Sequence, residues 1–319
     1  MTRPALYVSR LLPDTVMAAI AERFTLTAQP ASHPPSRADL LNGLRDAEFA
    51  ICTLTERVDA ETLCAAPRLR VIANYAVGYN NIDTAAAQAR GVRVTNTPDV
   101  LTETTADLTW ALLLAAARRV VEGHDLVHRG TWTGWEPLQL LGTEVHGRTL
   151  GIIGMGRIGQ AVSRRGVGFR MKILYTRRTP AGTPVPGAGG DPVSLDDLLT
   201  QSDFVSLHVP LTTDTHHLIG AAALQRMRPS AILINTSRGP VIDEAALVEA
   251  LRQGRLAGAG LDVYEREPDI HPGLRTLRQV TLLPHLGSAT LTTRARMGMV
   301  CVENLLAVLE GRPAPNCIA

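Results

Sequence analysis

The sequence predicts an α/β protein built on mostly parallel sheets, and three observations support that fold class. Short apolar strands alternate with helical stretches along the chain, a pattern typical of parallel sheets with helices on both faces. A glycine-rich turn at residues 154–159 joins one such strand to one such helix. The 319 residues, 45% of them hydrophobic and 19% charged, provide enough material for two domains of ordinary size.

The first third of the chain is expected to form one alternating α/β unit. Pro13 suits the first turn of a helix, and Gly91 stands where the end of a helix requires left-handed backbone. We expect strands at residues 5–8, 49–52, 69–73 and 92–95, and helices at 13–24, 59–65 and 83–89.

The remainder repeats this alternation after a long connecting helix. An alanine- and leucine-rich stretch predicts one helix over residues 101–121, and the loop at 129–141 holds Trp132 and Trp135. The Pro- and Gly-rich stretch at 179–192 indicates an exposed loop. Further strands are expected at residues 149–153, 172–175, 204–208, 231–235, 258–263 and 280–283, and a final helix at 291–309.

The turn at 154–159 has the sequence Gly-Met-Gly-Arg-Ile-Gly and precedes a predicted helix at 160–169. Between a strand and a helix, in a unit of about 30 residues, the G-x-G-x-x-G pattern strongly indicates dinucleotide binding. Gly154 allows the tight turn, Gly156 lets the backbone approach a pyrophosphate, and Gly159 lets helix and strand pack closely. The helix start offers N–H groups and partial positive charge to the phosphates.

The charge after the next strand indicates which dinucleotide is bound. NAD sites usually have Asp or Glu there, bonded to the ribose 2′-hydroxyl. In this chain Arg177, Arg178 and Thr179 occupy that stretch. Arginine suits the 2′-phosphate of NADP, so we expect NADPH to be preferred and NAD to be possible. The alternative is a solvated arginine pair on a loop.

Composition argues against several classes of function. A net charge of +2 without a basic block gives no electrostatic support for binding to nucleic acid or to a membrane surface. Lys172 is the only lysine, which nearly excludes a catalytic lysine. The four cysteines lack metal-ligand spacing, so we expect incidental or buried thiols and no metal. No leader-like start and no apolar run of membrane-spanning length stand out, which predicts a cytoplasmic protein.

Three polar residues follow successive predicted strands in the second half of the chain: Arg238, Glu267 and His285. Ligands of open α/β sheets bind outside the carboxyl ends of the strands, so we expect these side chains to converge there. Each alone has an ordinary alternative: an arginine that bonds a helix end, a solvated loop carboxylate, or a surface histidine. Their joint placement favours a functional site.

The three side chains suit the reduction of a 2-oxo acid, which requires a hydride, a proton donor and a cation. His285 can supply the proton, since imidazole exchanges protons near neutral pH. Glu267, if it pairs with His285, would fix the tautomer of the ring and favour its charged form. Arg238 offers a planar fork that can hold the carboxylate and polarise the C2 carbonyl.

With these motifs the chain resembles the D-isomer-specific 2-hydroxyacid dehydrogenases, most closely their glyoxylate/hydroxypyruvate reductase branch. The resemblance implies two doubly wound, Rossmann- or flavodoxin-like domains with a cleft between them. The substrate domain would comprise residues 1–98 plus 287–319, because the last helix returns to it, and the dinucleotide domain residues 99–286. The resemblance spans nearly the whole chain and is carried by residues 74–83, 147–159, 235–243, 261–268 and 284–289.

The resemblance also implies roles for individual residues. Arg238, Glu267 and His285 would be catalytic, and the backbone N–H groups of Val77 and Gly78 would hold the substrate carboxylate. Asp262 would bond the nicotinamide amide. The implied substrate contacts are Leu54, Val77, Gly78, Trp135, Arg238 and His285. The implied cofactor contacts are Thr105, Gly154, Gly156, Arg157, Ile158, Gly159, Arg177, Arg178, Thr179, His208, Val209, Pro210, Thr215, Thr236, Ser237, Arg238, Asp262, His285 and Gly287.

A homodimer is implied as well, because dimeric relatives pair through the connecting helix and the tryptophan loop. Trp135 would then reach the substrate pocket of the partner, whereas the alternative is a tryptophan packed in its own subunit.

The function expected from these observations is NADPH-dependent reduction of glyoxylate and hydroxypyruvate to glycolate and D-glycerate, with His285 as the proton donor. Another 2-oxo-acid reductase or a short phosphoglycerate dehydrogenase is the main alternative. Phosphite dehydrogenase is less fitting, since it uses a lysine near the position of Val77, where this chain has none. A nucleotide-sensing corepressor without turnover is a remote alternative, disfavoured by the complete Arg–Glu–His set.

Overall fold

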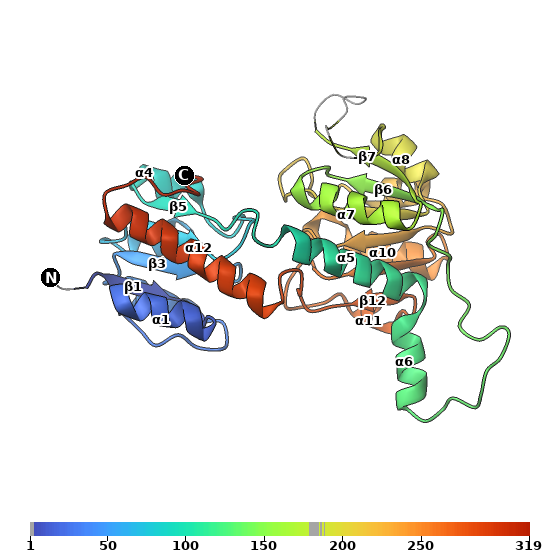
Figure 1. Cartoon of the computed structure of the whole chain (residues 1–319), viewed down its shortest axis with the longest axis horizontal. Helices are drawn as coiled ribbons and strands as arrows, with labels where there is room; N and C mark the ends of the chain where they lie inside the picture. The colour runs from blue at the N-terminus through green and yellow to red at the C-terminus, as the bar shows by residue number, and fades with distance from the viewer. Residues whose placement is uncertain (1–2, 179–184, 186, 188) are drawn as a thin grey trace. The chain divides into compact units, whose positions relative to one another are not determined.

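In a computed structural model, which describes residues 3–178, 185, 187 and 189–319, the chain divides into two compact units. Unit 1 comprises Met1–Leu101 and Ser288–Ala319, and unit 2 comprises Thr102–Gly287. Each unit is built on one sheet whose neighbouring strands run parallel (Figure 1). The predicted fold class, with two parallel-sheet α/β domains, is confirmed.

Unit 1 is a five-stranded sheet between two layers of helices. Its elements are β1 (Ala5–Val8), α1 (Asp14–Arg23), β2 (Thr25–Leu26), α2 (Arg37–Leu44), β3 (Phe49–Cys52), α3 (Ala60–Cys64), β4 (Val71–Asn74), α4 (Thr84–Ala89), β5 (Arg93–Thr95) and α12 (Leu291–Leu309). The strand order is β2-β1-β3-β4-β5. Gly91, just after α4, has a φ of 70°, the left-handed backbone that the sequence predicts.

Both faces of this sheet are buried. Leu6 and Val8 of β1 join the core beneath α1 and α12, which lie side by side. Tyr7, between them, points to the opposite core, which α2, α3 and α4 cover. Strands buried on two faces need apolar side chains at every position, which explains their continuous apolar runs.

Unit 2 is a seven-stranded sheet, also covered on both faces. Its elements are α5 (Thr102–Ala117), α6 (Val120–His128), β6 (Thr149–Ile153), α7 (Arg157–Gly168), β7 (Lys172–Thr176), β8 (Asp191–Pro192), α8 (Leu195–Gln201), β9 (Phe204–Leu207), α9 (Ala221–Arg226), β10 (Ile232–Asn235), a 3-10 turn η1 (Gly239–Val241), α10 (Glu244–Arg252), β11 (Gly258–Leu261), α11 (Pro272–Thr276) and β12 (Val280–Leu282). The strand order is β12-β11-β10-β9-β6-β7-β8. Helices α5 and α7 pack on one face, and α8, α9 and α10 pack on the other.

The prediction of a single helix over residues 101–121 is wrong. Helix α5 ends at Ala117, and Arg119, with a φ of 53°, separates it from α6. Thr143 donates its N–H to the Ala117 carbonyl (2.7 Å), and Gly142 approaches the same carbonyl so closely that a Cβ would overlap it. The returning chain therefore satisfies the end of α5 where the helix would otherwise continue.

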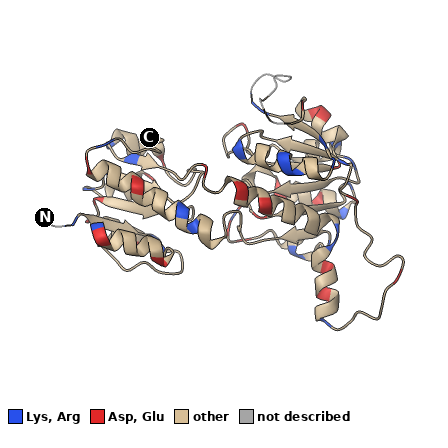
Figure 2. Ribbon diagram, in the orientation of Figure 1, with Lys and Arg blue, Asp and Glu red and all other residues tan. Residues whose placement is uncertain are grey.

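Charges of both signs are interspersed along the helices of the two units (Figure 2). Where α5 faces α7 the signs are complementary: Arg164 lies 2.8 Å from Glu103, and Arg165 lies 2.6 Å from Asp107. Exposed pairs of this kind contribute at most about 1 kcal/mol each.

No helix in the described part of the chain combines the length and the hydropathy needed to cross a membrane.

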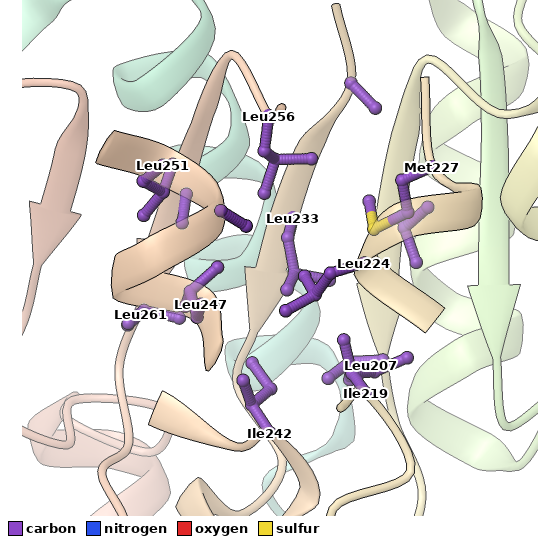
Figure 3. Packing of buried hydrophobic residues seen from close by; sticks show 14 of the residues in the cluster. Leu207, Ile219, Leu224, Met227, Leu233, Ile242, Leu247, Leu251, Leu256 and Leu261 are labelled. Carbon is purple, nitrogen blue, oxygen red and sulfur yellow. The ribbon is translucent and has the colours of Figure 1, made fainter. Parts of the chain in front are cut away.

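The largest core of unit 2 lies between its sheet and the helices α8, α9 and α10. Figure 3 shows Leu233 of β10 pointing into the layer that includes Leu224 of α9 and Leu247 of α10. Leu233 is completely buried. A well-packed core of this kind fixes the strand ends from which the loops of the site begin.

Replacing Leu233 by alanine is expected to lower the free energy of unfolding by about 2–5 kcal/mol, because the surrounding side chains only partly fill the cavity. Urea unfolding followed by circular dichroism measures the change. Val167→Ala on the exposed side of α7 is the control and should stay within about 0.5 kcal/mol of the wild type. Equal stability of the two variants would contradict the packing described.

Candidate active site

The glycine turn leads from β6 into α7, which begins at Arg157 rather than at residue 160. Gly154 has a φ of 101°, and an added Cβ would lie 2.6 Å from a backbone oxygen of the β9 loop. At Gly159 an added Cβ would overlap the Gly154 carbonyl oxygen. At Gly156, by contrast, no atom of the described residues lies within 4 Å of the Cβ position. The turn is closed on its inner side and open at Gly156, an arrangement that fits a pyrophosphate group.

The two arginines follow directly beside this turn. Gly154 donates its N–H to the carbonyl of Thr176, the last residue of β7 (2.9 Å), and Arg177 and Arg178 come next. The Arg178 side chain is exposed. The Nε of Arg177 is buried and has no hydrogen-bond partner among the residues described, a costly state that a bound anion would relieve. Thr179, also predicted to bind the cofactor, lies outside the described residues.

The loop after β9 carries further predicted cofactor residues. The His208 ring lies 2.8 Å from the Ser206 hydroxyl, and burial lowers the pKa of His208 to about 3, so the ring is neutral. Val209 is the next residue and packs against the glycine turn. The Thr215 hydroxyl donates to the carbonyl of Pro210 (2.6 Å), which closes the loop.

Two threonines of this group are buried and hydrogen-bonded. Thr105 of α5 donates to the Gly287 carbonyl (3.0 Å), and the Thr236 hydroxyl after β10 lies 2.8 Å from that of Thr109. These bonds tie α5 to the loops at the carboxyl edge of the sheet. Of the two remaining predicted residues in the first turn of α7, Arg157 is exposed and Ile158 packs against the core.

Arg238 is presented by a loop that a buried asparagine holds in shape. The Asn235 amide, at the end of β10, donates to the Arg238 carbonyl (2.9 Å) and accepts from the Ser237 N–H (2.9 Å) and hydroxyl (2.8 Å). Gly239 follows, and its backbone lies so close to the Tyr264 carbonyl group that any Cβ would overlap it. The loops after β10 and β11 are therefore in direct backbone contact.

That contact brings Arg238 near Glu267. Burial lowers the pKa of the Arg238 guanidinium, and the charge of Glu267 opposes this shift. Guanidinium groups stay protonated in proteins, so Arg238 is a half-buried cation. Its Nη1 donates to the Ser237 carbonyl (2.7 Å), which orients the fork.

Glu267 and His285 form a hydrogen-bonded pair. The Nδ1 of His285 lies 2.8 Å from Oε2 of Glu267, and the other carboxylate oxygen accepts the N–H of Tyr264 (3.1 Å). Burial raises the pKa of Glu267, but the bond to His285, the N–H of Tyr264 and the charge of Arg238 together bring it below its ordinary value. Glu267 is thus an ionised acceptor at neutral pH. Since it occupies Nδ1, the Nε2 of His285 is the nitrogen available for proton transfer.

Asp262 anchors the loop that carries His285. Its two carboxylate oxygens accept the N–H groups of Leu286 (2.7 Å) and Gly287 (2.9 Å), and its carbonyl accepts the N–H of His285 (2.9 Å). Burial raises the pKa of Asp262 despite these backbone donors. The resemblance implied a cofactor contact for Asp262, but neither this anchoring role nor that of Asn235 was predicted. Buried polar residues at strand ends were the available signal.

The remaining predicted substrate residues lie elsewhere. Leu54, Val77 and Gly78 belong to loops after β3 and β4 of unit 1, whereas Trp135 lies in unit 2 with 81% of its surface exposed. Trp135 is therefore not packed against the described residues of its own chain. The Ala76 carbonyl, in the same peptide as the Val77 N–H, accepts a hydrogen bond from the Thr97 N–H (2.9 Å). The Val77 carbonyl, in the same peptide as the Gly78 N–H, accepts one from the side-chain amide of Asn96 (2.8 Å).

Those bonds fix the direction of two N–H groups. In a trans peptide the N–H points away from the carbonyl, so the N–H groups of Val77 and Gly78 face away from Thr97 and Asn96. Neither N–H donates a hydrogen bond within the described ranges. Two free, adjacent N–H groups are suited to an anionic ligand such as a carboxylate.

Comparison with known proteins places this geometry in a family. The model of the D-isomer specific 2-hydroxyacid dehydrogenase NAD binding domain matches residues 110–287. A glyoxylate reductase from Korarchaeum cryptofilum is 49% identical, covering 99% of this chain and 96% of its own length. A solved protein from Thermus thermophilus is 48% identical with a TM-score of 0.93, covering 99% of this chain and 100% of its own.

A second solved structure carries ligands. It is an NADPH-dependent glyoxylate/hydroxypyruvate reductase from Sinorhizobium meliloti in complex with NADP and malonate, 35% identical with a TM-score of 0.88. The match covers 100% of this chain and 97% of that one.

Gly159→Ala is expected to weaken dinucleotide binding at least about tenfold, because the added methyl group displaces the Gly154 carbonyl and opens the turn. Titration of the protein with NADPH, followed by nucleotide fluorescence, gives the Kd. Gly168→Ala at the other end of α7 is the matched control, since no described atom lies within 4 Å of its Cβ position. An unchanged Kd in a folded Gly159→Ala protein would show that the turn does not hold the dinucleotide.

Proposed function

Since the chain belongs to the D-isomer-specific 2-hydroxyacid dehydrogenase family, we propose that it is an NADPH-dependent reductase of glyoxylate and hydroxypyruvate, forming glycolate and D-glycerate. The observation that carries the proposal is the Glu267–His285 hydrogen bond, formed where the loops after β11 and β12 meet the Arg238 loop. The names of the similar glyoxylate reductases support the choice of substrate.

We assign the cofactor to the carboxyl edge of unit 2. The glycine turn would hold the pyrophosphate, Arg177 and Arg178 the 2′-phosphate, and Asp262 the nicotinamide amide. When bound, NADPH supplies the hydride that reduces the C2 carbonyl. The buried Arg177 Nε and the absence of a carboxylate after β7 support NADPH over NADH.

The residues of the chain perform the other half of the reaction. The Val77 and Gly78 N–H groups bind the substrate carboxylate, and the Arg238 cation stabilises the negative charge that develops on the C2 oxygen. His285 donates the proton from Nε2 to that oxygen as the C2 carbon receives the hydride. Glu267 holds the protonated ring in orientation through Nδ1.

A panel of kcat/KM values tests the substrate. Glyoxylate, hydroxypyruvate, pyruvate and phosphohydroxypyruvate are each assayed with NADPH and with NADH. The proposal predicts the highest values for glyoxylate or hydroxypyruvate with NADPH. A maximum at phosphohydroxypyruvate would instead identify a short phosphoglycerate dehydrogenase, and a maximum at pyruvate a broader 2-oxo-acid reductase.

The double substitution Arg177→Asp, Arg178→Ala is expected to raise the KM for NADPH by about 10–100-fold while kcat is retained, because the 2′-phosphate is remote from the reacting carbon. Steady-state kinetics with both nucleotides measures the effect. Lys172→Ala, at the opposite end of β7, is the control. A selective collapse of kcat, or wild-type protein that uses NADH as well as NADPH, would refute the cofactor assignment.

We also propose a homodimer formed through α6 and the loop after it. No residue of α6 is buried by the part of the chain that the structure describes, and Val120, Val121 and Val127 are exposed. Figure 1 shows the helix and its loop extending from the sheet of their unit. The loop adds the exposed apolar side chains Trp132, Trp135, Leu138 and Leu141. Contiguous exposed apolar side chains mark interaction surfaces, and a second copy can cover them reciprocally.

A charged α6 is expected to dissociate the dimer. In sedimentation velocity the wild-type protein should have twice the chain mass of 34.2 kDa, and Val121→Asp, Val127→Asp should sediment at the single-chain mass, since burying an unpaired carboxylate is costly. Val167→Asp, on the exposed side of α7, should remain dimeric. A monomeric wild-type protein would overturn the homodimer.

We propose a cytoplasmic location for the enzyme. Its support is the pair of exposed free thiols, Cys64 and Cys317, which persist in a reducing compartment. Use of NADPH as a reductant is consistent with the same compartment.

A further inference from the structure

Two asparagines of unit 1 share a reciprocal pair of amide hydrogen bonds. Asn74, fully buried at the end of β4, donates from Nδ2 to the Oδ1 of Asn81 (3.3 Å), and Asn81 donates from Nδ2 to the Oδ1 of Asn74 (3.2 Å). A primary amide has two N–H hydrogens. The pairing uses one on each residue and directs the other outward.

The outward hydrogens bond the backbone of two different loops. Asn74 donates to the Gly78 carbonyl (2.9 Å), and Asn81 donates to the carbonyls of Thr53 (3.0 Å) and Glu56 (3.2 Å). The first loop contains the free N–H groups of Val77 and Gly78 described above. The second loop, after β3, contains the exposed side chain of Leu54. The amide pair is thus a bridge between the two loops to which substrate contacts are assigned.

With the bond from Asn74, three consecutive backbone carbonyls of this loop accept hydrogen bonds. Those of Ala76 and Val77 accept from Thr97 and Asn96, and the next carbonyl, Gly78, accepts from Asn74. Three consecutive peptide planes are therefore fixed on their carbonyl sides. The first two planes carry the free N–H groups of Val77 and Gly78, whose direction is therefore set by Thr97 and Asn96. Asn74 holds the third plane, that of Gly78 and Tyr79, and so fixes the backbone immediately after the free N–H groups.

The loop after β3 is held from its other side by a buried carboxylate. Glu56 accepts hydrogen bonds from the Ser9 hydroxyl (2.6 Å) and the Thr55 hydroxyl (2.6 Å), and also from the Thr53 N–H. With Asn81 bonded to the carbonyls at both ends of this short loop, its backbone is held on both sides. The position of Leu54 is then set by Glu56 and Asn81 together.

A separate connection at the base of the loops does not use the amide side chains. The Val58 N–H donates to the Asn81 carbonyl (2.9 Å), and the Asp83 N–H donates to the Val58 carbonyl (2.8 Å). These bonds involve only backbone, so substitution of the Asn81 side chain leaves them in place.

We propose that Asn74 and Asn81 are positioning residues for the substrate carboxylate. They fix the Val77–Gly78 backbone and the Leu54 loop relative to each other, so that both are ordered before the substrate binds. The inference rests on the proposed function, because it takes the Val77 and Gly78 N–H groups as the carboxylate site. Neither asparagine is assigned a contact with the substrate.

The test compares Asn81→Ala with the wild-type protein in three measurements: kcat and KM for glyoxylate, KM for NADPH, and the inhibition constant of oxalate. Loosening a carboxylate site weakens ground state and transition state alike, so KM and the oxalate constant should both rise about tenfold or more, with kcat nearly unchanged. The KM for NADPH should not change. Thr27→Ala, which removes a hydroxyl-to-carbonyl bond to Gly43 in the same unit (2.7 Å), should alter none of these values.

A purely structural role would lower the Tm of Asn81→Ala without changing KM or oxalate inhibition, and that result would overturn the proposal. If Asn81→Ala does not fold, Asn81→Gln, which keeps an amide but displaces it by one methylene, should show the same rise in KM. Absence of glyoxylate turnover in the wild-type protein would overturn the proposed function instead. In that case calorimetry with oxalate still tests the carboxylate site, and equal affinity in wild type and variant would overturn it.

Discussion

The close approach of the Gly239 backbone to Tyr264 is the contact on which the rest of the candidate active site depends. It joins the loops after β10 and β11 without an intervening side chain. Arg238 precedes that contact and Glu267 follows it, so a guanidinium and a carboxylate from different strands influence each other's ionisation. The parallel order β12-β11-β10 then brings the loop of His285 beside Glu267. Three residues far apart in the sequence meet because three strands end at one edge.

Buried polar side chains at strand ends shape the loops in both units. Asn235 ends β10 and folds the Arg238 loop, while Asp262 follows β11 and holds the backbone after His285. Asn74 ends β4 and holds the Gly78 carbonyl in the same manner. In each case a buried amide or carboxylate satisfies backbone groups that leave the sheet. The apolar strands fix where a loop begins, and these residues fix its course.

Much of the fold and of the site could be predicted because the evidence for them is local. The strands at residues 5–8 and 49–52 and the helix at 291–309 were predicted at their observed bounds, since continuous apolar runs and helical spacing are visible in short windows. The placement of Arg238, Glu267 and His285 after parallel strands was likewise predicted, because each follows a short apolar run in the sequence. The end of α5 was not, because it depends on Gly142 and Thr143, which return from a distant loop. The roles of Asn74 and Asn235 were missed although their partners Gly78, Ser237 and Arg238 are close in sequence, because the burial of a polar side chain at a strand end is not visible in a short window of sequence.

The central claim is that His285, oriented by Glu267, donates the proton to a 2-oxo acid. A single-turnover experiment tests it most directly: protein with one equivalent of bound NADPH is mixed rapidly with glyoxylate, and nucleotide absorbance is followed. The account predicts that the wild-type protein oxidises its NADPH and forms glycolate, and that His285→Gln binds NADPH equally well but reacts about 10²–10⁴-fold more slowly. Wild-type protein that holds NADPH without consuming it, or a His285→Gln variant that reacts at the wild-type rate, would contradict the account.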